Sequence, residues 1–293
     1  SAGIDTVIDA TDGNLQDGTT VVVNSSDTFS GSTGSADVIS YAGHAHTDST
    51  TLAQNEGAAN GMAINLSSST VTFYTGTTFT TAVSSAGTST LAAGKAAQYD
   101  SGATGADAGE KAIITGGEMD TLSGFEKVIG TAASDYINVA ATGMTVTGGA
   151  GADYIVAGAG VDTIVHGTSV AATDVTGVTA TVIAGDTITF GSGLDVVIGF
   201  NSAGDLIDVT TPATVGTFIG ETAATISELT TYVTSGDYNA TTGVFTIAAS
   251  GVGADTLIFE NEGTAANDAI ATMNNAMVLI GVVETSITTA DFI

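Results

Sequence analysis

The chain has no cysteine, no arginine, no tryptophan and a single proline in 293 residues. Without cysteine it can form neither disulfides nor thiolate metal sites, and thiol catalysis is excluded. Its only strongly basic side chains are three lysines, which face 31 acidic residues and leave a formal net charge of −28. Nucleic acid and anionic membrane surfaces both require a basic face, so we expect neither as a partner.

Long hydrophobic runs are also missing. The longest apolar stretch is AMVLIGVV at 276–283, which has the length of a strand and falls short of the ~20 residues that a membrane helix needs. We therefore expect no membrane insertion. The first ten residues, SAGIDTVIDA, contain neither a basic region nor Met, so we expect no Sec-type signal there and take Ser1 as a processed or excised start.

Aspartate and glycine are abundant instead. The acids are 22 Asp and 9 Glu, and many of the aspartates lie beside one of the 39 glycines. Short carboxylates next to glycine turns can join backbone carbonyls around a hard cation such as Ca²⁺. The alternative is that the acids serve only solubility, as an acidic surface does in a salty medium. Because 43% of the residues are hydrophobic and only 12% are charged, we expect a folded, β-forming chain rather than a disordered one.

Glycine, Thr, Val, Ile and Ala together predict many short strands joined by glycine turns. Two segments have apolar residues at helical spacing and are predicted as short helices. These segments are ATISELTTYV at 224–233 and TAANDAIATMNNA at 264–276.

A nine-residue repeat is the strongest internal pattern. From Gly130 onward the chain reads GTAASDYIN, VAATGMTVT, GGAGADYIV and AGAGVDTIV in uninterrupted register. The frame returns at 186–198, where two aspartates are again nine residues apart and FGSGLDVVI repeats the glycine and aspartate positions. The sixth positions of the first four units are Asp135, Met144, Asp153 and Asp162, and the eighth positions are Ile137, Val146, Ile155 and Ile164.

Units of this length favour a parallel solenoid. Strands of about three residues between tight glycine turns cannot pair back as hairpins, but they can wind into coils of two units, or eighteen residues. The aliphatic eighth position would then point inward and stack into a core column. Two polar segments, at about 44–61 and 75–110, are predicted as surface loops or insertions.

The spacing also predicts where the acids meet. In a two-unit coil, turns eighteen residues apart stack on one edge, so Asp135 and Asp153 should face each other across a gap that suits Ca²⁺. Asp162 would lie on the other edge beside Met144, and that site would be incomplete unless the later turn at Asp186 replaces Met144. The alternative is that the aspartates face solvent. The candidate ligands are Asp135, Gly148, Gly149, Gly151, Asp153, Gly158, Gly160, Asp162, Asp186, Gly191, Gly193 and Asp195.

GGAGADYIV and AGAGVDTIV resemble the GGxGxDxUx nonapeptide of RTX calcium-binding proteins, a parallel β-helix repeat. The segments that resemble those preceding such repeats in proteins exported by type I secretion are DVISYAG at 37–43, GMAINLSSSTVT at 61–72 and MDTLSGFEKVIGTAASDYI at 119–137. DVVIGFNSAGDLIDV at 195–209 resembles the end of the solenoid in serralysin-type C-terminal domains, and TSITTADFI at 285–293 resembles their uncleaved export signal.

The resemblance implies a calcium-binding β-roll, export by type I secretion machinery and an extracellular or cell-surface location. The chain departs from the family pattern in two ways, because only one unit has the full double glycine and Met144 replaces an acid. We therefore expect a few ions, about two to five, rather than a long row. Alphaproteobacterial S-layer proteins are similar in composition, being rich in Thr, Ala and Gly and poor in Lys.

Other motifs in the sequence provide weaker support for other functions. His44 and His46, with Asp48 nearby, could bind a transition metal, but surface histidines are the simpler interpretation, and no HExxH zinc helix is present. The glycine cluster lacks the Lys-Ser/Thr of a P-loop, and DATDGNLQD at 9–17 lacks the closing Glu of an EF-hand. Paired acids for glycoside hydrolysis are an alternative, but with acids this abundant such pairs occur by chance, and no nucleophile elbow or Ser/His/Asp arrangement appears.

The sequence therefore predicts an all-β protein: a parallel β-roll or β-helix solenoid with calcium-binding glycine-aspartate turns, long surface loops and a C-terminal β-rich cap. Residues 1–29 are predicted as N-terminal strands that start the solenoid or form an assembly edge. Residues 30–199 are predicted as the solenoid, clearest at 130–165 and 186–198, and residues 200–293 as the cap with an export-signal-like end.

We expect a non-enzymatic, secreted structural protein that assembles with copies of itself in a surface layer, matrix filament or adhesin. Its mean hydropathy of +0.36 is high for so acidic a chain, and the open ends of a solenoid can pair with another copy. One alternative is the calcium-dependent export module of a hydrolase whose catalytic domain lies upstream. Another is an adhesin that binds cell-surface polysaccharide, for which the 17 aromatic residues without Trp provide little support.

Overall fold

The computed structural model of the chain is an all-β protein. In the part of the chain that it describes, the only helices are two short 3-10 helices, η4 (Glu284–Ser286) and η5 (Thr289–Asp291). None of the helices in this part is long and apolar enough to cross a membrane. The structure describes residues 6–8, 28–31, 37–42, 61–72, 74–75, 81–82, 90–100, 112–113, 119–139, 141–166, 175–177, 181–191, 193–209, 214–215, 224–225, 230–261 and 273–293.

The chain divides into two compact units. The first comprises residues 1–149 and 158–160, and the second comprises residues 150–157 and 161–293. The division falls inside the nine-residue repeats. The boundaries predicted at residues 29 and 199 stay predictions.

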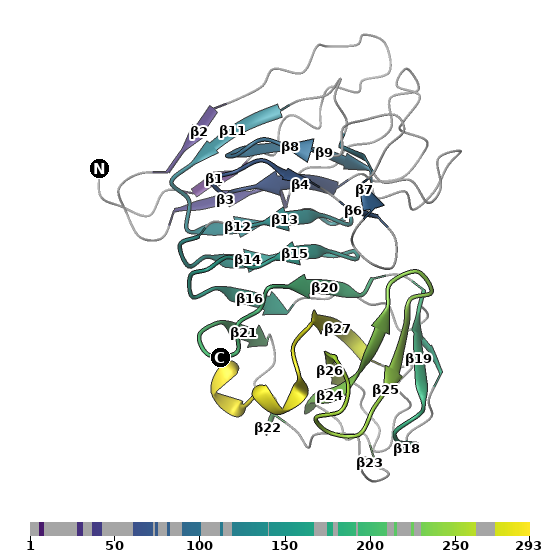
Figure 1. Cartoon of the computed structure of the whole chain (residues 1–293). Coiled ribbons are helices and arrows are strands. Elements are labelled where there is room, and N and C mark those ends of the chain that lie inside the picture. The colour runs from purple at the N-terminus through teal and green to yellow at the C-terminus, as the bar shows by residue number, and fades with distance from the viewer. Residues whose placement is uncertain are drawn as a thin grey trace. The chain divides into compact units, whose positions relative to one another are not determined.

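Parallel strands three residues long form one side of the first unit. They are β1 (Thr6–Ile8), β3 (Val38–Ser40), β12 (Lys127–Ile129) and β14 (Thr145–Thr147), paired in that order. Figure 1 shows β3, β12 and β14 one below another. The central residues Ile39, Val128 and Val146 are aligned with one another and fully buried. Their side chains therefore form a continuous apolar column.

A mixed sheet forms the rest of the first unit. Strand β13 (Tyr136–Asn138) pairs in parallel with β4 (Gly61–Asn65), and β4 pairs antiparallel with β9 (Lys95–Asp100). Strand β9 continues antiparallel to β10 (Ala112–Ile113) and to β11 (Met119–Ser123), and β11 is parallel to β2 (Thr28–Ser30). The small hairpins are β5 (Val71–Thr72) with β8 (Thr90–Leu91), and β6 (Tyr74–Thr75) with β7 (Thr81–Ala82).

The second unit also contains short parallel strands. Strand β16 (Thr163–His166) pairs with β21 (Leu206–Val209), and β15 (Tyr154–Val156) pairs with β20 (Asp195–Ile198). Ile164 lies opposite Ile207, and Ile155 lies opposite Val197; all four side chains are buried. Each of these strands therefore aligns a buried aliphatic residue with one on its partner, as β3, β12 and β14 do in the first unit.

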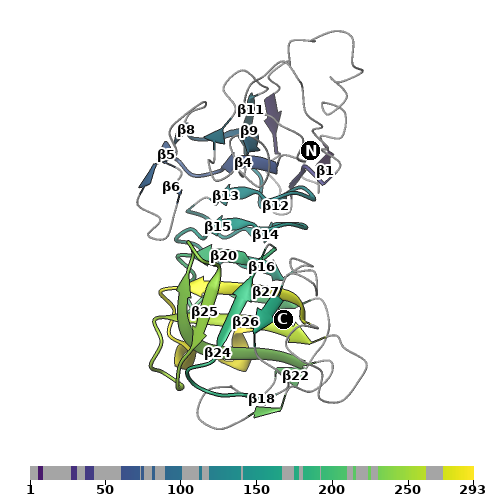
Figure 2. The same cartoon turned by 90° about the vertical axis from the view of Figure 1, so that its right-hand side faces the viewer.

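A long sheet continues from β20 in the second unit (Figure 2). Strand β20 is parallel to β27 (Met273–Ile280), after which β26 (Asp255–Asn261), β24 (Thr230–Asn239), β25 (Val244–Ile247), β19 (Thr187–Phe190) and β17 (Val175–Gly177) follow as antiparallel neighbours. Strand β22 (Thr214–Val215) is parallel to β24, and β18 (Thr181–Val182) pairs with β23 (Ala224–Thr225). On one face, Tyr232 stacks on Phe259 with ring centroids 5.2 Å apart.

The predicted inward placement of the eighth-position residues is confirmed at each repeat. The eighth-position residues are all at most 1% exposed, and each is the middle residue of a three-residue strand or the second residue of β16: Ile137, Val146, Ile155 and Ile164. The nine-residue frame therefore located both the strands and their inward residues correctly.

The predicted helix at 224–233 is wrong. Residues 224–225 form β23 and 230–233 begin β24, which pairs with β26 over its first seven residues. In the second predicted helix, residues 273–276 belong to β27 and the preceding ones lie outside the described residues. The polar segment predicted as a loop at 75–110 contains β7, β8 and β9, of which β9 is a central strand of its sheet; residues 44–60 lie outside the described part.

Candidate metal centre

Buried acids lie where short parallel strands begin. Each of the following residues directly precedes a strand or is its first residue, and each is at most 4% exposed: Asp37, Asp135, Asp153, Asp162, Asp195 and Asp205. The alternative that these aspartates face solvent is wrong. We call these strand starts, each with its buried acid, the corners. A buried carboxylate needs compensating donors or a cation, so the hydrogen bonds of each corner show whether its charge is already compensated.

In the second unit, the carboxylates of Asp195 and Asp205 bind the backbone of the strand beside them. The N–H of Asp153 donates to Oδ1 of Asp195 at 3.0 Å, and the N–H of Asp162 donates to Oδ1 of Asp205 at 2.9 Å. The strand register explains both bonds, because Asp153 lies opposite Asp195 and Asp162 lies opposite Asp205. Two pairs of acids are thus placed one strand spacing apart, at about 4.8 Å between backbones.

The second carboxylate oxygen of Asp205 closes its own turn. Oδ2 accepts the N–H of Asn201 at 2.8 Å, four residues earlier in the chain. Asp205 therefore closes its own turn before β21 and links that turn to the start of β16. This residue is ten positions after Asp195, which is why the nine-residue frame missed it.

Asp135 has the same arrangement in the first unit. Its Oδ1 accepts the N–H of Met62 at 2.5 Å and its Oδ2 accepts the N–H of Thr131 at 2.6 Å. Burial raises the pKa of Asp135 from 3.8 to about 7, although the hydrogen bonds from Met62 and Thr131 oppose the shift. Glu126 takes the equivalent place before β12 and accepts the N–H of Asp37 at 2.9 Å. Asp135 and Glu126 show that the acid-to-backbone link is a general feature of these corners.

Glycine is required where these corners bring backbones together. Gly149 has φ of +114°, and a Cβ there would lie 1.9 Å from the carbonyl oxygen of Thr131. A Cβ on Gly160 would lie 2.1 Å from the backbone nitrogen of Gly143. Among the other predicted glycines, Gly151 and Gly193 have positive φ, as expected for tight turns. The remaining ones flank strands: Gly148 follows β14, Gly158 precedes β16, and Gly191 is exposed after β19.

The structure does not bring Asp186 to Asp162. Asp186 lies in a turn before β19, where its Oδ2 accepts the N–H of Ile183 at 3.0 Å, and β19 pairs with β17 and β25. The strand beside β16 is β21, so Asp205 takes the position in which Asp186 was expected. Asp135 and Asp153 belong to different units, and their predicted pairing stays a prediction.

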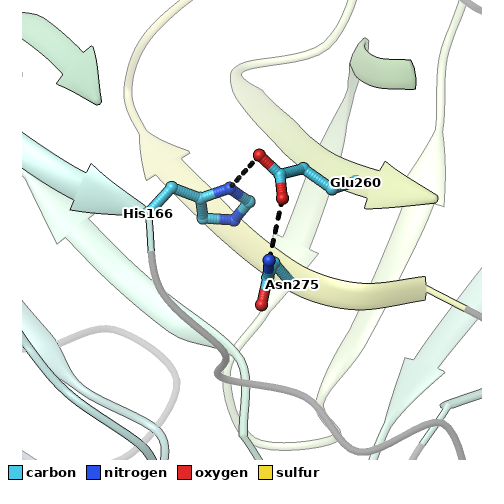
Figure 3. A network of polar contacts seen from close by, with 3 residues as sticks. All are labelled: His166, Glu260 and Asn275. Atoms are coloured by element: carbon cyan, nitrogen blue, oxygen red, sulfur yellow. Dashed lines mark hydrogen bonds and ion pairs between the residues drawn. The ribbon is translucent and has the colours of Figure 1, made fainter. Parts of the chain in front are cut away.

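A buried polar network lies elsewhere in the second unit (Figure 3). Nδ1 of His166, at the end of β16, is 3.7 Å from Oε1 of Glu260 on β26, and Nδ2 of Asn275 on β27 donates to Oε2 of Glu260 at 2.8 Å. All three residues are at most 1% exposed. The amide of Asn275 orients the carboxylate, and the carboxylate links β16 to β26. His44 and His46 lie outside the described residues.

The carboxylate oxygens of the corners are suitable ligands for a hard cation, but each corner needs further ligands to bind one. Asp153 with Asp195, and Asp162 with Asp205, each supply two buried carboxylates, and three lysines cannot neutralise 31 acids. Ca²⁺ takes about six to eight oxygens, so backbone carbonyls of the glycine turns would have to complete each set. Within the described residues, no three His, Asp or Glu side chains are grouped closely enough to hold one ion.

The chain matches no protein-family model and no curated protein sequence.

Proposed function

We propose that this protein is a secreted, calcium-binding structural protein. In this proposal its short parallel strands form a β-solenoid, and the aspartate corners beside them hold a few Ca²⁺ ions. The role is mechanical rather than catalytic: the folded chain becomes a building unit of a surface layer, a matrix filament or an adhesin.

The observation that carries the proposal is the stacking of buried acids along the strand starts. Asp153 and Asp195, and likewise Asp162 and Asp205, are adjacent in register and almost completely buried. A buried carboxylate costs several kcal/mol unless a cation or several donors compensate. Each of these four aspartates has a stacked acid neighbour, and hard divalent cations are the partners that such oxygen sets prefer.

The residues of the corners would couple ion binding to folding. Bound Ca²⁺ would supply positive charge between carboxylates that otherwise repel each other. Asp195 and Asp205 already fix the starts of β15 and β16 through backbone hydrogen bonds. Because the carboxylates come together only when these strands pair, cation binding stabilises the folded state alone.

The resemblance of the repeats to RTX nonapeptides supports the same conclusion. It implies that the chain leaves the cell through type I secretion machinery in a loosely folded state and folds where calcium is abundant. Partners would then be copies of itself and, in an adhesin, cell-surface polysaccharide. The net charge of −28 favours cations over nucleic acid as ligands.

Calcium titration of the full chain tests the proposal. The protein is stripped with EDTA, Ca²⁺ is added stepwise, and circular dichroism, urea unfolding and negative-stain microscopy follow each step. We expect β-structure and the urea midpoint to rise with Ca²⁺, and particles larger than monomers to appear. An unchanged spectrum and midpoint would refute the metal proposal, whereas calcium-dependent folding with monomers at every concentration would refute assembly.

A matched pair of variants assigns the site. The double variant Asp153→Asn with Asp195→Asn should weaken the apparent calcium affinity on the order of ten-fold, because two of the ligand charges are lost. Asp208→Asn is the control, since Asp208 is half-buried in the middle of β21 and lies outside the corners. Equal effects of the two changes would indicate general charge loss and would contradict a site at this corner.

A further inference from the structure

The end of the chain lies on the outer edge of β21. Phe292 forms a parallel bridge to Ile207, the N–H of Ile293 donates to the carbonyl of Ile207 at 3.0 Å, and the N–H of Val209 donates to the carbonyl of Ile293 at 3.3 Å. Figure 1 shows the C-terminus beside β21. The edge of β21 therefore accepts an extended segment in parallel orientation.

This terminal segment covers the edge only lightly. Two backbone hydrogen bonds hold it there, Phe292 is half-buried and Ile293 is 59% exposed. The residues just before it are held more firmly, because Ile287 and Asp291 are buried in the unit and a capping box between Thr288 and Asp291 fixes η5. Residues 292–293 can thus leave the edge without disturbing the residues that anchor the segment.

The first described strand has an edge of the matching kind. Strand β1 is parallel to β3, with Val7 opposite Ile39, and β3 is its partner within the described residues. Val7 aligns with the inward residue of β3 in the first unit, as Ile207 aligns with the inward residue Ile164 in the second. In sequence, Asp5 precedes β1 as Asp205 precedes β21.

We propose that copies of the chain join head to tail, with β1 of one copy pairing in parallel with the outer edge of β21 of the next. Residues 292–293 occupy that edge in the single copy and act as a displaceable cap. This inference rests on the self-assembly in the proposed function and names the surfaces that carry it. A second copy is the fitting occupant because β1 has the parallel orientation and the strand length of the ladder that it would extend, and its register places Val7 opposite Ile39.

We call the contact between β1 of one copy and β21 of the next the joint. Its formation should depend on calcium because both copies are strongly acidic. Each copy carries a net charge of −28, so two copies repel each other until cations screen or bridge the acids. Asp205 directly precedes β21, the strand whose edge would pair, so a cation bound there would lower the repulsion where two copies meet. We therefore expect the joint to form in Ca²⁺ and to weaken in chelator.

Engineered disulfides test the joint directly, because the native chain has no cysteine. If Val7 aligns with Ile207, Thr6 aligns with Leu206, and parallel neighbours about 4.8 Å apart fall within the Cα separation of a disulfide. The double variant Thr6→Cys with Leu206→Cys should therefore give a ladder of covalent multimers in Ca²⁺ under mild oxidation. The control, Thr6→Cys with Thr163→Cys, moves the second cysteine to β16, one strand inside the edge, and should give no ladder.

The outcomes separate this inference from the proposed function. Calcium-dependent folding and assembly without a ladder would overturn the head-to-tail joint and leave the function standing. An equal yield of dimers from Thr6→Cys alone would also overturn it, because it would indicate a symmetric contact. A ladder that forms equally in chelator would support the joint and contradict the role of calcium.

A proline tests the cap. Ile293→Pro removes the N–H that bonds Ile207, and Phe292 already has φ of −110° and ψ of 138°, which a following proline permits. In the double-cysteine background we expect about five- to ten-fold faster cross-linking, as for the loss of roughly one hydrogen bond from the competing cap. Ile293→Ala keeps the N–H and is the control. Unchanged or slower cross-linking of the proline variant would overturn the cap.

Discussion

Replacing Asp205 by alanine should destabilise the second unit, because two backbone N–H groups lose their acceptor. Its carboxylate accepts the N–H of Asp162 at 2.9 Å and that of Asn201 at 2.8 Å, and Asp205 is 1% exposed. The donor of Asp162 is buried with its residue, so leaving it unpaired costs about 1–3 kcal/mol. Asn201 is exposed and can bind water, so this loss adds about 1 kcal/mol. We expect a decrease of about 2–4 kcal/mol in the free energy of unfolding.

The free energy of unfolding of Asp205→Asn should lie between those of the wild type and Asp205→Ala. The amide keeps one oxygen for Asp162 but places an NH₂ group against the N–H of Asn201, so we expect a loss of about 1–2 kcal/mol. Urea unfolding followed by circular dichroism in EDTA measures both changes, and Asp208→Ala, on the same strand, should stay within about 0.5 kcal/mol of wild type. If Asp205→Ala also stays within that range, the corner hydrogen bonds do not hold the strands as described. In Ca²⁺ the difference from wild type should widen if Asp205 is a ligand.

Two further changes probe the core and the buried acid of the first unit. Ile155→Ala removes a side chain that is 1% exposed and should lower the free energy of unfolding by about 2–5 kcal/mol. The control is Val156→Ala, a half-buried neighbour whose replacement should lower it clearly less. Equal losses in urea unfolding would contradict the inward position of Ile155. Asp135 has a pKa of about 7 in the folded chain against 3.8 as its ordinary value, so the folded state binds more protons than the unfolded state between these values. The free energy of unfolding in calcium-free buffer should therefore fall as pH rises from about 4 to about 7. The urea midpoints at pH 5 and pH 8 should differ less in Asp135→Asn than in wild type. An unchanged difference would contradict the assignment to Asp135.

The parallel strands could be predicted from sequence because their signal is local and strictly periodic. Each unit of nine residues carries its own glycine turn and its own inward residue, as at Ile137 and Ile155, and the structure follows that frame from β12 to β16. The partners of the acids could not be predicted in the same way. Asp205 lies one residue outside the frame, and the strand that pairs with β16 is reached only after a long insertion.

The strand β24 could not be recognised from the sequence because much of it is buried on both faces. Residues 231–236 of β24 are all buried, so the strand lacks the alternation of polar and apolar residues by which half-buried strands are recognised. Ile226, Leu229 and Val233 happen to have helical spacing, but the run of β-branched and aromatic residues from Thr230 to Thr234 favours a strand. Pairing with β26 and β25 then decides the outcome, as tertiary context often does for short segments.

The magnitudes at the corners explain why a cation could control this fold. Two carboxylates about 5 Å apart repel by roughly 3 kcal/mol at an effective dielectric constant of 20, which is the expected scale for Asp153 with Asp195 and for Asp162 with Asp205. A hydrogen bond from a backbone N–H to a charged carboxylate contributes about 1.5–3 kcal/mol, and each of these pairs has such a bond between its members. Attraction and repulsion are therefore nearly balanced at each corner. Neutralising the carboxylates removes the repulsion and keeps the hydrogen bonds. Calcium at about 100 times the dissociation constant would then shift the folding equilibrium by about 2.7 kcal/mol for each occupied corner.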